Sequence, residues 1–195
     1  MASRLWPLLV LCFVVVLTGA GTVAAQSGPE QVVRVEPVVR EGELYIDADV
    51  EFEVTSELRT AAQKGVPVYF SADLKITSQR WWWFDQTLVD QQTTWRIVYN
   101  ALTRQWRVGT GELSIPVSSF DDALSFVHNI RGWAVADVND LDVDQRYQGR
   151  LRVRLDTSRL PRPFQIDAYN SSAWSIATPW TDFQFSISAD DHQPS

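Results

Sequence analysis

The sequence predicts a mainly β protein: an antiparallel, β-sandwich-like single domain with a short helix at about residues 56–64 and a longer helix at about residues 119–130. The clearest sign is Glu43–Val54, where apolar and polar side chains alternate. Such alternation is typical of a strand with one face buried and one face in water. About nine extended segments, separated by turn residues, favour a sandwich or barrel-like fold.

Strands are expected on both sides of this alternating segment. Val32–Val39 should form a hairpin with it, and Tyr147–Asp156 should be a strong strand, because its apolar residues alternate with polar ones. Leu160–Ile166 is predicted to be extended, because Pro161 and Pro163 fix φ and oppose a helix. The other strands are expected at residues 66–78, 80–89, 93–101, 104–108, 112–116, 133–138 and 183–187.

The ends of both helices carry recognisable signals. Ser56 can cap the short helix, and Gly65 can close it. Ser118 or Ser119 can cap the longer helix, whose apolar residues recur at helical spacing. Gly132 is expected to end this longer helix.

The N-terminus has the pattern of a cleaved signal peptide over residues 1–25. Arg4 supplies a positive charge, Leu5–Leu17 is apolar, and small residues precede Ala25. The apolar run is shorter than the roughly 20 residues that a membrane-spanning helix needs, which disfavours an uncleaved anchor. We therefore expect a periplasmic or secreted protein with no stable membrane span after cleavage.

Cleavage would leave one β-rich domain at residues 26–188 and a flexible tail at residues 189–195. The only cysteine, Cys12, would be lost, so a hydrophobic core alone would have to hold the mature domain. Removing Arg4 would change the net charge from -7 to -8. Such an acidic domain is a poor candidate for binding nucleic acid.

Catalytic and metal-binding motifs are scarce. His128 and His192 are the only histidines, and neither stands in a recognisable catalytic or metal-binding pattern. A carboxylate pair could serve a hydrolase, but Asp47–Glu53 resembles a solvated strand face more than a cleft. The acidic segment Asp137–Asp144 lacks the glycine and the final acid of a calcium loop. We expect no cofactor, no metal and no catalytic residue.

Three arginines form a second candidate feature. Arg150, Arg152 and Arg154 alternate with apolar residues and should stand on the outer face of their strand. One interpretation is an anion-binding stripe. The other, which we favour, is a ladder of ion pairs with the acidic face of Asp47–Glu53.

The most conspicuous candidate for binding is the aromatic run Trp81, Trp82, Trp83 and Phe84. On a strand, two of these side chains would face the core and two would face away. The outward pair could bind a sugar or a protein partner. The alternative is a tryptophan-rich core, shared with Trp95, Trp106, Trp133, Trp174 and Trp180.

Three ordered segments carry a family resemblance: RWWWFDQ (Arg80–Gln86), YNALTRQWRV (Tyr99–Val108) and LDTSRLPRPFQ (Leu155–Gln165). They resemble the proteobacterial DUF4390 family of secreted proteins. The resemblance implies a bacterial envelope protein of unknown function. Neighbouring genes in that family imply an accessory role beside a sensor kinase, and the family supplies no catalytic residues.

The sequence therefore favours a non-enzymatic periplasmic or envelope protein that binds a ligand or a partner, such as a sensor kinase. One alternative is a protein that binds carbohydrate or peptidoglycan through exposed tryptophans. A carboxylate-based hydrolase is a third and less favoured alternative.

Overall fold

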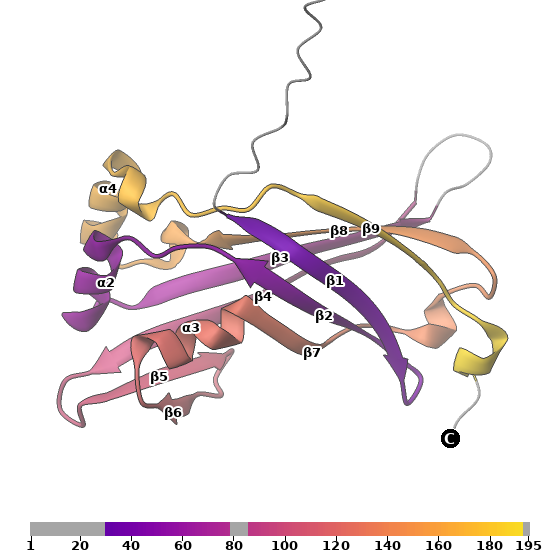
Figure 1. Ribbon diagram of the computed structural model, residues 1–195, viewed down its shortest axis with the longest axis horizontal. Helices are drawn as coiled ribbons and strands as arrows, with labels where there is room; N and C mark the ends of the chain where they lie inside the picture. The colour runs from indigo at the N-terminus through magenta and orange to yellow at the C-terminus, as the bar shows by residue number, and fades with distance from the viewer. Residues whose placement is uncertain (1–29, 79–85, 193–195) are drawn as a thin grey trace, which may run out of the picture.

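Two antiparallel sheets make up most of the computed structural model, which describes residues 30–78 and 86–192 (Figure 1). A small sheet has the order β1-β2-β7, and a large sheet has the order β6-β5-β4-β3-β8-β9. The strands are β1 Gln31–Arg40, β2 Glu43–Glu51, β3 Val68–Ser78, β4 Gln86–Asn100, β5 Gln105–Thr110, β6 Ile115–Val117, β7 Asn129–Asp137, β8 Arg146–Leu155 and β9 Thr181–Ser186. The prediction of a mainly β, sandwich-like domain is confirmed.

The core lies between the two sheets. Along β2, every second side chain from Leu44 to Val50 is buried, as the alternation predicts. On β3, the face that runs from Val68 to Ile76 is buried in the same way. Just beyond β2, Phe52 stacks on Phe70 of β3 with ring centroids 5.0 Å apart, so the two sheets are joined by direct apolar contact.

The small sheet lies across the large one in Figure 1. β1 contacts β8 and β9, whereas β7 contacts β4 on the opposite side of the sandwich. The predicted hairpin is confirmed, because β1 pairs with β2 along its length. Helix α3, Phe120–His128, packs on strands of both sheets and closes the gap between them near β5 and β6.

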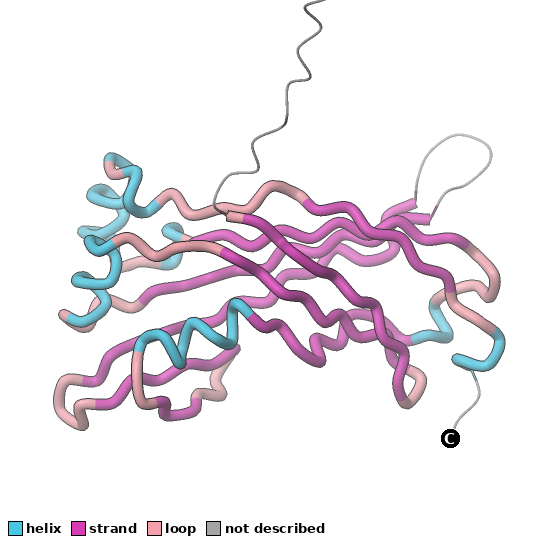
Figure 2. The backbone as a smooth tube through the Cα atoms, viewed as in Figure 1, coloured by secondary structure: helices cyan, strands magenta, loops and turns pink. Residues whose placement is uncertain are grey.

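The helical segments gather mainly at the two ends of the sandwich (Figure 2). Helices α2 and α4 lie at one end, and the 3-10 turns η1 and η4 touch one another at the other end. None of the helices in the described ranges is long and apolar enough to cross a membrane. Their bounds are α2 Ser56–Gln63, α4 Arg162–Asn170, η1 Val138–Asp140, η2 Thr157–Arg159, η3 Ser172–Trp174 and η4 Ala189–His192.

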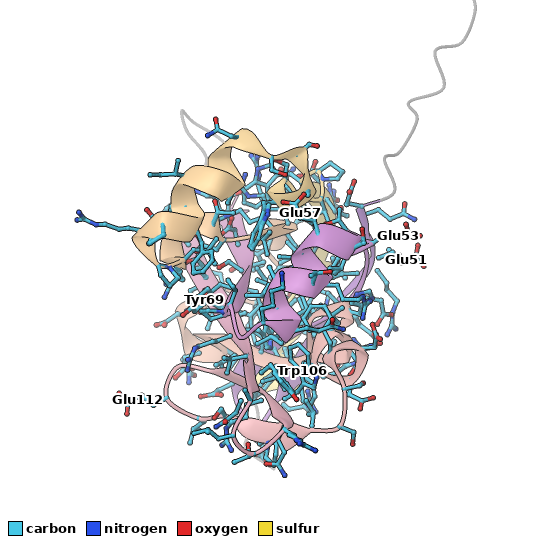
Figure 3. All side chains as sticks on the ribbon, turned by 90° about the vertical axis from the view of Figure 1, so that its left-hand side faces the viewer. Glu51, Glu53, Glu57, Tyr69, Trp106 and Glu112 are labelled. Carbon is cyan, nitrogen blue, oxygen red and sulfur yellow. The ribbon has the colours of Figure 1, made fainter. Side chains whose placement is uncertain are left out.

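Figure 3 looks onto the end that carries α2 and α4. Glu57 on α2 accepts a hydrogen bond from the indole nitrogen of Trp174, at 3.1 Å, and so ties α2 to η3. Glu51 and Glu53 lie on one side of this end, and Tyr69 lies on the other, where the outer face of the large sheet begins.

The ends of the first two helices differ in part from the prediction. Thr55, not Ser56, caps α2, because its Oγ1 accepts a hydrogen bond from the backbone of Leu58 at 3.2 Å. Ser119 caps α3, as predicted. Gly132 does not end α3, which stops at His128; it lies within β7 at a φ of 62°, where β7 shifts its register against β2.

The segment Leu160–Ile166 is not extended. Helix α4 begins at Arg162, with Pro163 at its second position. The first helical turn has no intrahelical partner for its N–H groups, so a proline there costs no hydrogen bond. The prediction failed because it treated both prolines as helix breakers, whereas Pro161 is the N-cap of α4 and Pro163 lies in its first turn.

The predicted strands at residues 80–89 and 93–101 are one strand where the structure describes them. β4 runs without interruption from Gln86 to Asn100 and pairs with β3 through Gln91 and Gln92. The polar residues 90–92 separate the two predicted strands in the sequence. Pairing with β3 keeps them extended instead.

The close approach of β9 to β8 yields a prediction. At Gly149 of β8, an added Cβ would lie 2.1 Å from Cζ of Phe183 on β9. Gly149→Ala should lower the free energy of unfolding by about 1–3 kcal/mol, because the Phe183 ring must move. In a Phe183→Ala background the same change should cost less, by about 0.5 kcal/mol or more. Urea unfolding of the four proteins tests this, and equal costs in both backgrounds would contradict it.

Candidate functional site

The three predicted arginines lie together on the outer face of the large sheet. Leu151, Val153 and Leu155 of β8 are buried in the core, so the alternating Arg150, Arg152 and Arg154 point away from it. We call these three residues the arginine face. Their position confirms the alternation predicted for this strand.

The predicted acidic partner of the arginine face is wrong. β8 lies between β3 and β9 of the large sheet, whereas Asp47–Glu53 belongs to β2 of the small sheet and the residues just after it. Within the small sheet, Asp49 instead pairs with Arg34 of β1, at 2.8 Å, and with Arg131 of β7. The ladder of β2 with β8 therefore does not exist.

Asp73 of β3 takes the place of that acidic strand. Its Oδ2 accepts hydrogen bonds from Nε of Arg152 at 2.8 Å and from Nε of Arg154 at 3.0 Å. Its Oδ1 accepts one from Nε2 of Gln92 on β4 at 2.7 Å. A single carboxylate thus joins β4, β3 and β8 across the outer face of the sheet.

The electrostatics of Asp73 follow from these contacts. Desolvation raises the pKa of Asp73, but the hydrogen bonds from Gln92, Arg152 and Arg154 outweigh it and leave the pKa below its ordinary value. The same bonds fix two of the three guanidinium groups. Arg154 also lies 3.4 Å from the buried carboxylate of Asp156, so it has the most neutralised charge of the three.

Trp180 supports the other end of the arginine face. The guanidinium carbons of Arg150 and Arg152 each lie 4.6 Å from the centroid of its ring, within the range of a cation–π contact. Arg150 is exposed, and within the described ranges no carboxylate oxygen lies within 4.0 Å of its nitrogens. The contact with Trp180 holds Arg150 in place, while the N–H groups of its guanidinium stay available for hydrogen bonds.

Sequence reasoning missed both Asp73 and Trp180. Asp73 sits in an alternating strand that looks like any half-buried strand, and Trp180 stands alone after a proline. Neither residue could have been found without knowing the strand order. Asp73, for example, meets Arg152 only because β3 pairs with β8. The arginines themselves were predictable, since alternation alone sets their face.

The tryptophans divide into three groups. Trp95, Trp106 and Trp174 are buried in the core, as expected for most of them, and Trp133 and Trp180 are half-buried. The candidate residues Trp81, Trp82, Trp83 and Phe84 lie outside the described residues. Sugar stacking therefore has no fully open indole face to use among the tryptophans that the structure describes.

Comparison with known protein families assigns the chain to one family. The model of the domain of unknown function DUF4390 matches residues 30–184, which is most of the chain. The protein belongs to the DUF4390 family. No curated protein and no solved structure matches this DUF4390 chain.

A depression of about 470 Å³ opens between the end of β2 and helices α2 and α3 of this DUF4390 domain. Arg59 of α2 and Asp121 of α3 form a two-pronged ion pair at its edge, at 3.0 and 2.8 Å. The ring of His128 lies against Phe52 in the same depression, with centroids 4.3 Å apart. Its Nε2 is buried and has no hydrogen-bond partner among the described residues.

The acidic segment at residues 137–144 has a structural role. Asp137 caps η1, where its Oδ1 accepts a hydrogen bond from the backbone of Asn139 at 2.8 Å. Across residues 30–78 and 86–192, no group of three or more His, Cys, Asp or Glu side chains is placed to hold a metal ion. Nothing in the geometry described above resembles a catalytic centre.

The Asp73 contacts yield a prediction about acid stability. Asp73→Asn should lower the free energy of unfolding at pH 7 by about 2 kcal/mol, because two charge-assisted hydrogen bonds are lost. The folded pKa of Asp73 is depressed, so its contribution is present above the unfolded pKa of about 4 and is lost as pH falls through the folded value. The difference between wild type and variant, measured by urea unfolding, should therefore shrink between about pH 5 and pH 2.

Asp90→Asn is a matched control, because Asp90 forms an exposed ion pair with Lys75 on the same face. It should cost less than about 1 kcal/mol. A difference between wild type and Asp73→Asn that is the same at pH 7 and pH 3 would contradict the role of Asp73.

His128 yields the second prediction about pH. Desolvation lowers the pKa of His128 against the opposing effects of Asp121 and Glu51. Below the unfolded pKa of about 6.5, the unfolded chain then binds more protons than the folded one, so acid destabilises the fold. His128→Phe keeps a ring against Phe52 without the titration. The free energy of unfolding of wild type should fall relative to this variant between pH 7.5 and 5, and parallel pH curves would contradict the prediction.

Proposed function

We propose that this DUF4390 protein is a non-enzymatic interaction protein of the bacterial envelope that binds an acidic segment of a partner through its arginine face. Export by a signal peptide and an accessory role beside a sensor kinase are parts of the same proposal. They rest on the sequence pattern of residues 1–25 and on the family resemblance.

The proposal rests on the position of the Arg150 guanidinium and on its lack of an ion-pair partner among the described residues. Its guanidinium is held over Trp180, stands exposed on the outer face of the sheet and has no carboxylate partner among the described residues. A planar guanidinium with an available fork is suited to binding a carboxylate with two parallel hydrogen bonds. Preorganisation by stacking reduces the entropy lost when the partner binds.

The neighbouring residues add to this suitability. The guanidinium of Arg152 makes the same contact with the Trp180 ring, although its Nε already donates a hydrogen bond to Asp73. Lys75 lies in register with Arg150 across the β3–β8 pair and adds a further positive charge, partly offset by Asp90. Asp182 of β9 lies in register with Arg150 on its other side but forms no ion pair with it in the structure. The protein as a whole is acidic, so this local arrangement would orient an acidic partner toward one face.

The prediction concerns the binding of a fluorescent peptide that contains a run of glutamates. Arg150→Ala should weaken binding by about tenfold, because a fixed guanidinium–carboxylate pair is removed. Arg150→Lys should recover only part of the affinity, since an ammonium group lacks the planar fork. Fluorescence anisotropy at low and high salt gives both the affinity and its dependence on charge.

Arg162→Ala is the matched control, because Arg162 is an exposed arginine on α4. It should leave binding unchanged. Equal affinities of wild type and Arg150→Ala, or a loss of binding with Arg162→Ala of the same size, would contradict the proposal. Crosslinking and pull-down from envelope extracts with wild type and Arg150→Ala would then identify the natural partner.

A further inference from the structure

We propose that the unpaired edge of β4 accepts an extended, basic segment of a partner protein as an added strand. This site is separate from the arginine face and prefers the opposite charge. Binding at an open strand edge is an established way of recognising peptides: backbone hydrogen bonds supply affinity, and alternate side chains supply specificity.

The edge exists because the two neighbours of β4 differ in length. On one side, β3 pairs with β4 from Gln86 to Ile97. On the other side, β5 pairs only with Trp95–Asn100. In the described part of the chain no strand pairs with that second edge from Gln86 to Thr94.

Three of the four edge strands of the two sheets are blunted; the fourth, β9, pairs with β8 without a register shift. β1 carries Pro37 and a register shift, and the three-residue β6 carries Pro116. β7 is distorted at Gly132, where φ is 62°. Proline, short length and irregular register all discourage the addition of another strand. In β4 one extra residue interrupts the register near Thr87, but Val89–Thr94 then pairs residue for residue with β3 and has no proline.

The open edge borders a groove. A depression of about 550 Å³ lies between Leu88–Gln91 of β4 and the end of β7 with η1. A second depression of about 400 Å³ lies at the far end of the same edge, lined by Trp95, Phe126 and Arg131 among others; Arg131 is paired with Asp49. Between the two depressions, Nε2 of Gln91 donates to the backbone oxygen of Val135 at 2.9 Å. A side chain, not strand pairing, therefore bridges β4 to β7.

The lining of the groove indicates the chemistry of the partner. Asp90, Asp137 and Asp140 place three exposed carboxylates around the first depression, and no lysine or arginine lines it. Asp90 already pairs with Lys75 at 3.0 Å and Asp137 caps η1, so among the described residues Asp140 has the most available carboxylate of the three. Val89 and Leu141 line this depression but are only 7% and 4% exposed, and Trp95 at the far end is 8% exposed, so the main apolar side chain open to a partner is Phe126, which is 39% exposed. An extended segment with alternating apolar and basic side chains matches both features.

The test uses a fluorescein-labelled eight-residue peptide in which valine and lysine alternate, measured by anisotropy against the whole protein. Two N-methylated versions are compared with it: one methylated on the lysine amides, the other on the valine amides. In a bound strand only one of these sets of N–H groups faces β4. One version should therefore bind at least about tenfold more weakly, while the other keeps its affinity.

Protein variants test the charge. Asp140→Lys removes no hydrogen bond found in the structure and should weaken binding by about fivefold. Glu112→Lys makes the same charge change in the turn between β5 and β6 (Figure 3), at a residue that lines neither depression, and should leave binding unchanged. Hydrogen exchange should show slower exchange of amides in Val89–Thr94 when the peptide binds.

Three results would overturn the proposal. The first is equal binding of both N-methylated peptides, or equal binding of a valine–glutamate peptide. The second is peptide-induced protection elsewhere than β4. The third is slow hydrogen exchange of Val89–Thr94 without peptide, in a dimer that forms as the protein concentration rises. That result would mean that the edge binds a second copy of the chain. None of these results depends on Arg150, so the two proposals can fail separately.

Discussion

The burial of one face of β3 against β2 is the constraint on which the rest of the structure depends. β3 is the centre of the large sheet, and every second residue of it from Val68 to Ile76 lies in the core. The only cysteine of the chain, Cys12, lies before the described residues, so no disulfide holds this part of the fold. Apolar area is the main source of stability, and it fixes which side of each neighbouring strand points outward.

That constraint creates the arginine face. Once the core face of β3 and β8 is set, Asp73, Arg152 and Arg154 must meet on the outer face through the register of the two strands. Asp73 neutralises part of the positive charge, and Trp180 supports the rest. The positive charge is therefore neutralised at Arg154 and most available at Arg150, within a protein that is acidic overall.

The failures of prediction have two causes, one local and one distant in sequence. Prolines and glycines have different effects in different places: Pro163 fits a first helical turn, and Gly132 fits a bulge in β7 rather than a helix end. Residues 90–92 separate two predicted strands, yet pairing with β3 holds them in β4. For Gly132 and for residues 90–92, a contact distant in sequence outweighs a weak local preference, whereas for Pro163 the position in the first helical turn decides.

The sequence by itself determined the fold class, the buried face of β2 and the outward position of Arg150, Arg152 and Arg154, because alternation with a period of two is a local property of one strand. It also carried enough of the family pattern for DUF4390 to be recognised. Only the tertiary structure decided that Asp73 pairs with the arginines, that Trp180 lies beneath them and that β4 keeps an open edge. Strand order and the lengths of neighbouring strands decide these features, and both depend on pairing between segments far apart in the chain.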